Sequence, residues 1–263
     1  MSRLRVFVSS AVFSFKAQFD WLNPSMYLTM KFVLTLSQMA FFVFVGMFSG
    51  GGAKVVAFVA VGNALQALSW NTVFSVIKIT GQDKWDGTLP LVLATPASRL
   101  PLFVGRAMIH VLDGILSVAI SFFFAAFIFG VDFTNTNIPA LAVTVLLTAT
   151  TMAGFGLLIG GFSFHFRNPL VFANIFTFVL LIFCGVNFPV AALPTLAQPI
   201  SYAFPLTYGT DAARQAIAGT SLFGISSLLA KQVVVGILSI GLGYLLFAQF
   251  ERSARKTGKM EAL

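Results

Sequence analysis

The chain has 263 residues and a net charge of +8, with 58% hydrophobic residues and only 9% charged residues. Because a soluble domain carries about 25% charged residues, this composition excludes a soluble protein and leaves too little polar sequence for a separate catalytic domain. It predicts an all-α membrane protein.

The N-terminal segment begins with two arginines and an apolar run over 6–15, and so imitates a signal peptide. The bulky Phe15 and the charged residues after it do not form a cleavage site. At helical spacing the apolar residues share one face, so residues 1–24 are predicted to form an amphipathic helix in the membrane interface. Asn23-Pro24 then breaks that helix.

Apolar stretches long enough to cross a bilayer core, which takes about 20 residues per helix, fill most of the remaining chain. Together they predict one transmembrane domain over residues 1–263. The six predicted spans are Tyr27–Phe48, Val55–Ile77, Ala107–Gly130, Pro139–Ser163, Leu170–Phe188 and Leu228–Phe250.

Basic residues are concentrated in alternate gaps between these spans and at the termini. The other gaps hold only Lys54, Arg214 and Lys231. This is the positive-inside pattern; it explains the net charge without a nucleic-acid partner and predicts that both termini are cytoplasmic. The residues on the predicted cytoplasmic side are Arg3, Arg5, Lys16, Lys78, Lys84, Arg99, Arg106, Arg167, Arg252, Arg255, Lys256 and Lys259.

Polar side chains inside the predicted spans are functional candidates because they are costly in lipid. Asn63, Gln66 and Trp70 form a stripe on the second span, which faces a substrate path or hydrogen-bonds a neighbouring helix. His110 and Asp113 share a face of the third span about one turn above Arg106. A local charge pair at the cytoplasmic end is favoured there over a proton relay.

One further charge lies near the cytoplasmic end of the first span. Lys31 is predicted to extend its ammonium group to the membrane interface. Cys184 is the only cysteine, so the chain forms no intramolecular disulfide.

Two polar or irregular regions interrupt the spans. Residues 78–106 form a cytoplasmic segment long enough for a short helix, and its compact polar island, Asp83–Pro90, is expected to contact a partner in water. Residues 187–227 lie outside and are nearly as apolar as the spans, but prolines divide them into short pieces. We expect short helices that dip into the outer leaflet; the alternative is a hydrophobic surface loop.

Motifs for energy use or bond cleavage are missing from the sequence. Gly50–Lys54 lacks the spacing of a phosphate-binding loop, and no histidine and cysteine cluster has zinc spacing. No catalytic residue and no metal ligand is therefore predicted, and the chain is not expected to be an enzyme.

Two sequence blocks resemble those of ABC-2 type permeases, the membrane subunits of ATP-binding cassette exporters. Asp86–Arg99 is similar to their cytoplasmic block, which reads acidic residue, Gly-Thr-Leu-Glu, leucines and Thr/Ser-Pro; Pro90 replaces the glutamate here. Asn187-Phe188-Pro189, Ala192-Leu193-Pro194 and Phe204–Arg214 resemble the outer block. The six spans and the amphipathic N-terminal helix agree with this family, so the resemblance covers the whole chain.

The resemblance implies a division of labour between subunits in a bacterial plasma membrane. Two copies of a cytoplasmic ATPase bind ATP and magnesium, and a second permease, identical or paralogous, completes the membrane path. The acidic contact to the ATPase comes from Asp83 or Asp86, and Trp85 is the apolar anchor of a short docking helix. The implied coupling residues are Asp83, Lys84, Trp85, Asp86, Gly87, Thr88 and Leu89.

The same resemblance makes residues 187–227 an outer gate or lateral exit, with Asp211 and Arg214 linking it to the helix ends. The expected cargo is a hydrophobic or amphipathic small molecule such as an antibiotic, and the alternative is a lipid-linked glycan, lipo-oligosaccharide or polysaccharide. An intramembrane enzyme and a carrier that works alone are the competing classes. The implied gate residues are Phe188, Pro189, Pro194, Pro205, Tyr208 and Arg214.

Overall fold

A computed structural model of the chain describes residues 9, 23–85, 99–163 and 169–257. The predicted interfacial helix over 1–24 lies almost entirely outside these residues, and so do Asp86, Gly87, Thr88 and Leu89. All regular elements of the described ranges are helices, in agreement with the predicted fold class.

The first two long helices are joined by a glycine turn. Helix α2 (Pro24–Phe48) starts at the proline that follows Asn23, and α3 (Ala53–Trp85) starts directly after Gly52. Gly50 has a φ of 83°, a conformation that side chains other than glycine rarely adopt. The predicted short connection between the first two spans is therefore present.

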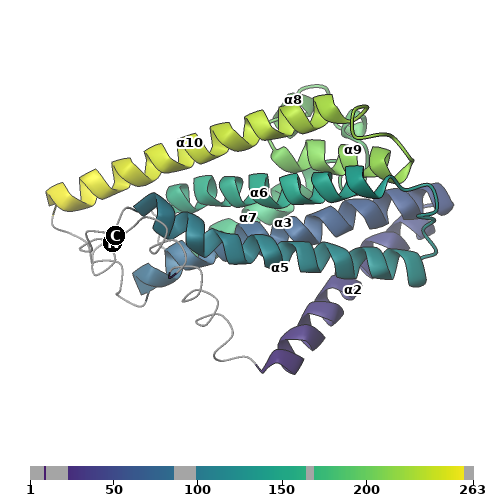
Figure 1. Cartoon of the computed structure of the whole chain (residues 1–263), viewed down its shortest axis with the longest axis horizontal. Coiled ribbons are helices and arrows are strands. Elements are labelled where there is room, and N and C mark those ends of the chain that lie inside the picture. The colour runs from purple at the N-terminus through teal and green to yellow at the C-terminus, as the bar shows by residue number, and fades with distance from the viewer. Residues whose placement is uncertain (1–8, 10–22, 86–98, 164–168, 258–263) are drawn as a thin grey trace.

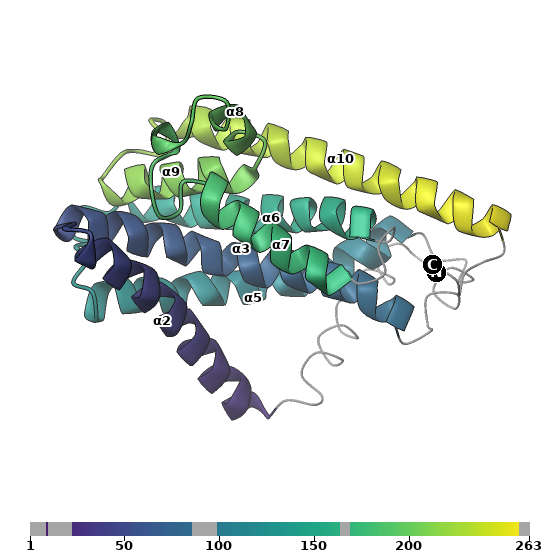
Figure 2. The ribbon, with the colours of Figure 1, turned by 180° about the vertical axis from the view of Figure 1, so that it is seen from behind.

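The remaining long helices run along the same axis as α3, and helix α2 leans away from them at its Pro24 end (Figures 1 and 2). Asn137 precedes α6 and its side-chain Oδ1 accepts a hydrogen bond from the Ala140 backbone N–H at 3.1 Å, which caps the helix. These helices are α5 (Arg99–Phe127), α6 (Ile138–Ser163), α7 (Pro169–Phe183) and α10 (Ser226–Thr257).

Within the described residues, five helices are long and apolar enough to cross a membrane. The predicted fifth span, Leu170–Phe188, is shorter in the structure because α7 has 15 residues and ends at Phe183. At 1.5 Å per residue it is roughly 22 Å long, less than the hydrocarbon core of about 30 Å. The six-span arrangement thus stays a prediction.

Short helices follow α7, as the prolines predict. They are η1 (Val190–Ala192), α8 (Gln198–Ser201) and α9 (Pro205–Ile217). Figure 1 shows α8 and α9 at the end of the bundle where the glycine turn and the α5–α6 loop also lie. Helix α9 packs against α3, α6 and α10, so this region is integrated into the bundle.

The described ends of α3, α5 and α10 project from the opposite end of the bundle (Figure 1). The predicted spans end at Ile77 in α3 and Phe250 in α10 and begin at Ala107 in α5, and these helices extend seven or eight residues beyond those points. At 1.5 Å per residue this is roughly 11 Å. Much of the predicted segment 78–106 is therefore a helical continuation of α3 and α5, because the helical hydrogen-bond pattern does not stop where the apolar sequence stops.

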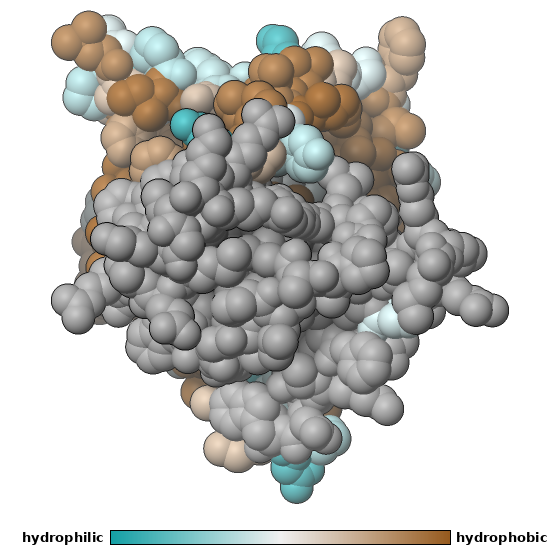
Figure 3. All heavy atoms as spheres, turned by 90° about the vertical axis from the view of Figure 1, so that its left-hand side faces the viewer, coloured by the Kyte–Doolittle hydropathy of each residue, from teal (hydrophilic) through white to brown (hydrophobic). Residues whose placement is uncertain are grey.

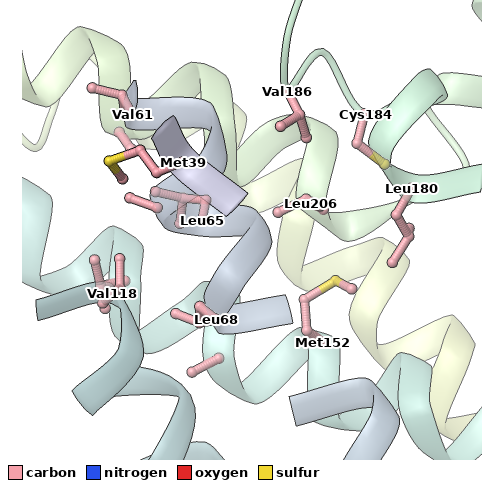
Figure 4. Close-up of a cluster of buried hydrophobic side chains, with 14 of the residues drawn as sticks. Met39, Val61, Leu65, Leu68, Val118, Met152, Leu180, Cys184, Val186 and Leu206 are labelled. Carbon is pink, nitrogen blue, oxygen red and sulfur yellow. The ribbon is translucent and has the colours of Figure 1, made fainter. Parts of the chain in front are cut away.

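Helix α3 lies at the centre of the hydrophobic core. Its Leu65 and Leu68 pack with Met39 of α2, Val118 of α5 and Met152 of α6 (Figure 4). Large apolar side chains also cover the flanks of the bundle, including Leu34 and Phe41 of α2 and Leu245 of α10. Figure 3, viewed from the projecting end, shows mostly brown side chains with teal ones between them along the upper edge.

Candidate functional site

Arg214 of α9 connects three separate parts of the chain at the end of the bundle where α8 and α9 lie (Figure 1). Its guanidinium group lies 3.5 Å from the centre of the Phe58 ring of α3. Its Nη2 donates hydrogen bonds to the carbonyl oxygens of Phe58 at 3.1 Å, Gly185 at 2.8 Å and Val186 at 3.0 Å. Because the last two follow α7, one side chain holds α9, α3 and the α7 turn together.

Arg214 is a largely buried cation whose nearby carboxylate, Asp211, interacts with it only weakly. The Asp211 carboxylate lies 3.6 Å from its Nη1, and the Asp211 side chain is 47% exposed. Burial lowers the pKa of Arg214 to about 10, although Asp211 acts in the opposite direction. The guanidinium therefore stays charged at neutral pH, and the three carbonyl groups carry its stabilisation.

Close approach of the α7 turn to α3 depends on Gly62. A Cβ atom at this position would lie 2.0 Å from the Val186 carbonyl oxygen and 2.7 Å from the Arg214 Nη2. Beside it, Asn63 donates a hydrogen bond from Nδ2 to Asn187 Oδ1 at 2.8 Å. We call the set Phe58, Gly62, Asn63, Gly185–Asn187 and Arg214 the outer junction.

The predicted gate residues divide into two groups. Pro205, Tyr208 and Arg214 belong to α9 and are largely buried, and the Tyr208 hydroxyl donates to the Tyr202 carbonyl oxygen at 3.0 Å. The other group is exposed and lies along the connection between α7 and α8: Phe188, Pro189 and Pro194. Sequence reasoning linked Arg214 to the helix ends, and the contacts of Arg214 supply that link.

The predicted substrate stripe on α3 is turned toward neighbouring helices. Asn63 and Gln66 are 2% and 0% exposed, and the Gln66 Nε2 donates to the Thr177 carbonyl oxygen of α7 at 3.3 Å. Trp70 stacks on Phe74 with ring centres 5.4 Å apart. These contacts match the hydrogen-bonding alternative for Asn63 and Gln66, and a role in a substrate path stays a prediction.

A buried charge pair joins α2 to α5. Lys31 Nζ is paired with Asp113 Oδ1 and also donates to the Asp113 carbonyl oxygen at 2.9 Å and to the Tyr27 hydroxyl at 2.8 Å. The Tyr27 hydroxyl in turn donates to Asp113 Oδ1. We call Tyr27, Lys31 and Asp113 the α2–α5 charge cluster.

This cluster corrects two sequence predictions. Lys31 is only 7% exposed, so its predicted extension to the interface is wrong. The predicted charge pair of Asp113 with its own helix end is also corrected, since its partner comes from α2. Residue depth was the missed signal: Lys31 and Asp113 lie four and six residues inside their predicted spans, so their charges are at similar heights.

His110, which lies three residues before Asp113 in α5, is 3% exposed. Its carbonyl oxygen accepts a hydrogen bond from the Thr72 Oγ1 of α3 at 3.4 Å. Among the described residues, no group of three or more His, Cys, Asp or Glu side chains is placed to hold a metal ion.

Comparison with known families decides the class of this helical bundle. The family model of the ABC-2 type transporter matches residues 11–218, which is 208 of the 263 residues. The chain belongs to the ABC-2 type transporter family. A comparison with curated proteins gave no match. As an ABC-2 type domain the chain is a membrane transport component of an ABC transporter, and the family implies an ATPase subunit as its partner.

Three predicted coupling residues of this ABC-2 type domain lie in the described part of the chain. Asp83, Lys84 and Trp85 are the last residues of α3. Trp85 was predicted in a short docking helix of its own, whereas in the structure it belongs to the long helix α3. The coupling residues Asp86 to Leu89 come directly after this end and lie outside the described residues.

Proposed function

We propose that the chain is the permease subunit of an ATP-driven exporter that moves a hydrophobic or amphipathic small molecule out of the cytoplasm or the inner leaflet. The observation that carries this proposal is the distribution of polarity. Lys31 is paired with Asp113 inside the bundle, and Gln66 is fully buried. The exposed faces of α2, α7 and α10 carry large apolar side chains, so a cargo moving along them meets an apolar wall.

The projecting end of α3 supports the proposed coupling to the ATPase. Trp85 lies eight residues beyond Ile77, the end of the predicted second span, which is roughly 12 Å at 1.5 Å per residue. A rigid helix of this length transmits a displacement at residues 83–89 to the core, since α3 packs against α2, α5, α6, α7 and α9. We propose that two ATPase subunits grip these segments on two permease subunits, identical or paralogous, with ATP and magnesium bound by the ATPases.

The opposite end supports the proposed gate. Leu196 and Phe223 are each 90% exposed and Tyr202 is 50% exposed, so the region between α7 and α10 presents apolar surface at the end of the bundle. The outer junction fixes the base of this region to α3. We propose that the exposed part acts as the outer gate or lateral exit in a bacterial plasma membrane, with both termini on the cytoplasmic side.

Reconstitution with the ATPase that co-purifies with the chain tests this function. Vanadate-sensitive ATP hydrolysis in proteoliposomes is measured with the amphipathic dye rhodamine 6G and, separately, with an undecaprenyl-linked oligosaccharide. Stimulation by the dye together with ATP-dependent dye movement supports the proposal. Stimulation by the glycolipid alone contradicts the small-molecule cargo, and transport without any ATPase contradicts the permease assignment.

A further inference from the structure

Helix α2 is held to the bundle along one narrow stripe. Its buried residues are spaced four apart, which places them on a single face, and the rest of its surface is largely exposed. Figures 1 and 2 show its Pro24 end diverging from α5 and α3. The stripe consists of Lys31, Thr35, Met39 and Val43.

The two halves of this stripe differ in chemistry. Toward Phe48 the stripe is apolar, with Met39 and Val43 1% and 0% exposed, and beside it Phe44 packs on Phe129, which follows α5, with ring centres 6.3 Å apart. Toward the Pro24 end, the α2–α5 charge cluster makes the contact. Breaking an ion pair inside a bundle leaves two unpaired charges, so this contact is either made or broken.

The contact between α6 and α10 is interlocked in a way that the α2–α5 contact is not. Gln232 of α10 donates from Nε2 to Thr148 Oγ1 at 2.9 Å and to Thr151 Oγ1 at 3.2 Å. A Cβ at Gly236 would lie 2.5 Å from Thr151 Cγ2, and one at Gly243 would lie 2.8 Å from the Leu158 nitrogen. These close approaches interlock α6 and α10, so the two helices move together.

The position of the charge cluster makes it reversible. Lys31 and Asp113 lie four and six residues inside the predicted spans that begin at Tyr27 and Ala107. At 1.5 Å per residue these charges are about 6 Å and 9 Å from the polar end of each span. Once separated, the ammonium group can extend toward the interface, and neither charge is left at the centre of the bilayer, where the cost is largest.

We propose that Tyr27, Lys31 and Asp113 form a latch that holds α2 against α5 in this state and opens during the ATP-driven cycle. Helix α2 is then the moving element, and α6 and α10 form the fixed body. Two discrete states of a contact are what a switching element requires, and paired and separated charges supply them. The inference rests on the ATP-driven transport proposed above.

Spin-label distance measurements test the latch while keeping the charge pair intact. With Cys184 replaced by Ala, labels are placed at the exposed neighbours of the pair, Met30→Cys on α2 and Leu112→Cys on α5. The control pair is Thr150→Cys on α6 with Ile237→Cys on α10, both exposed. Labelled chains are diluted with unlabelled chains in liposomes that contain the ATPase partner, and distances are recorded without nucleotide and with ATP plus vanadate.

The expected result is a new, longer α2–α5 distance with ATP and vanadate, and an unchanged α6–α10 distance. Asp113→Asn should populate the longer distance without nucleotide, and the exchange Lys31→Asp with Asp113→Lys should restore the short one. If the α2–α5 distance is the same with and without nucleotide while the complex hydrolyses ATP, the latch is overturned. This test does not need the Asp113→Asn variant to assemble. Absence of ATP hydrolysis by the assembled wild-type complex instead contradicts the proposed transport function, so the two failures are distinguishable.

Discussion

Replacing Gly62 with alanine is expected to detach the α7 turn from α3. The added Cβ would lie 2.0 Å from the Val186 carbonyl oxygen, whereas ordinary contact begins at 3.4 Å. The turn must therefore move away by roughly 1.4 Å. A shift of this size lengthens the hydrogen bonds from Arg214 to Gly185 and Val186, now 2.8 and 3.0 Å, beyond the normal range.

The free-energy change that Gly62→Ala causes in the opening of the outer junction has three contributions. Overpacking of a filled site costs about 1–3 kcal/mol, and each lost hydrogen bond to a charged group costs about 1.5–3 kcal/mol. Alanine has a better helix propensity than glycine, which offsets about 1 kcal/mol of these costs. With the Arg214 bonds weakened rather than abolished, local opening of the outer junction becomes easier by about 3 kcal/mol, which is a factor of about 100 in the opening equilibrium.

Cys184 provides the assay, because it is the only cysteine, is 0% exposed and precedes Gly185 in the same turn. The rate of its reaction with a maleimide dye in detergent micelles measures how often the turn opens. Gly62→Ala should raise this rate by about 100-fold, in line with the opening equilibrium. The control is Gly241→Ala in α10, where nothing lies within 4 Å of the added Cβ. Equal labelling rates in the two variants refute the reasoning.

Three further substitutions are expected to separate structural from functional residues. Arg214→Lys should destabilise the outer junction by about 2 kcal/mol, because an ammonium group lacks the planar guanidinium fork that bonds the carbonyls and stacks on a ring. The Cys184 labelling rate measures this destabilisation, and a labelling rate equal to that of the wild type contradicts the prediction. Gln232→Leu should change the free energy of unfolding by less than about 1 kcal/mol, since Thr148 and Thr151 keep their own hydrogen bonds to α6 carbonyl oxygens. A thermal unfolding measurement that shows a large loss of stability contradicts this expectation. Trp85→Ala should lower transport-coupled ATP hydrolysis at least tenfold without changing membrane insertion, and normal coupling rejects the docking role.

The fold was largely predictable because hydropathy and turn chemistry act locally. Gly50 and Pro24 mark a turn and a helix start through their own backbone preferences, and the structure has both. Helix ends were less predictable, since α3 continues to Trp85 and α7 stops at Phe183. Helix α7 stops just before Gly185, whose φ of 65° is a conformation that favours glycine and interrupts a helix.

The contacts of the candidate site were harder to predict because they join residues far apart in the chain. Lys31 and Asp113 each looked like a charge near an interface, and only the packing of α2 on α5 makes them partners. Gly62 carried no signal of its own, because its importance comes from the Val186 carbonyl oxygen and from Arg214. Sequence patterns record what each helix buries, but not which neighbour it meets.

Photo-cross-linking from the two ends of α3 tests most directly whether a separate ATPase drives this permease. A benzophenone amino acid replaces Trp85 at the projecting end or Ala53 at the other end of the helix, and intact cells are irradiated. The account predicts an adduct with the ATPase from position 85 and none from position 53. An adduct from position 53 alone, or none from position 85 in a complex that transports, would contradict it.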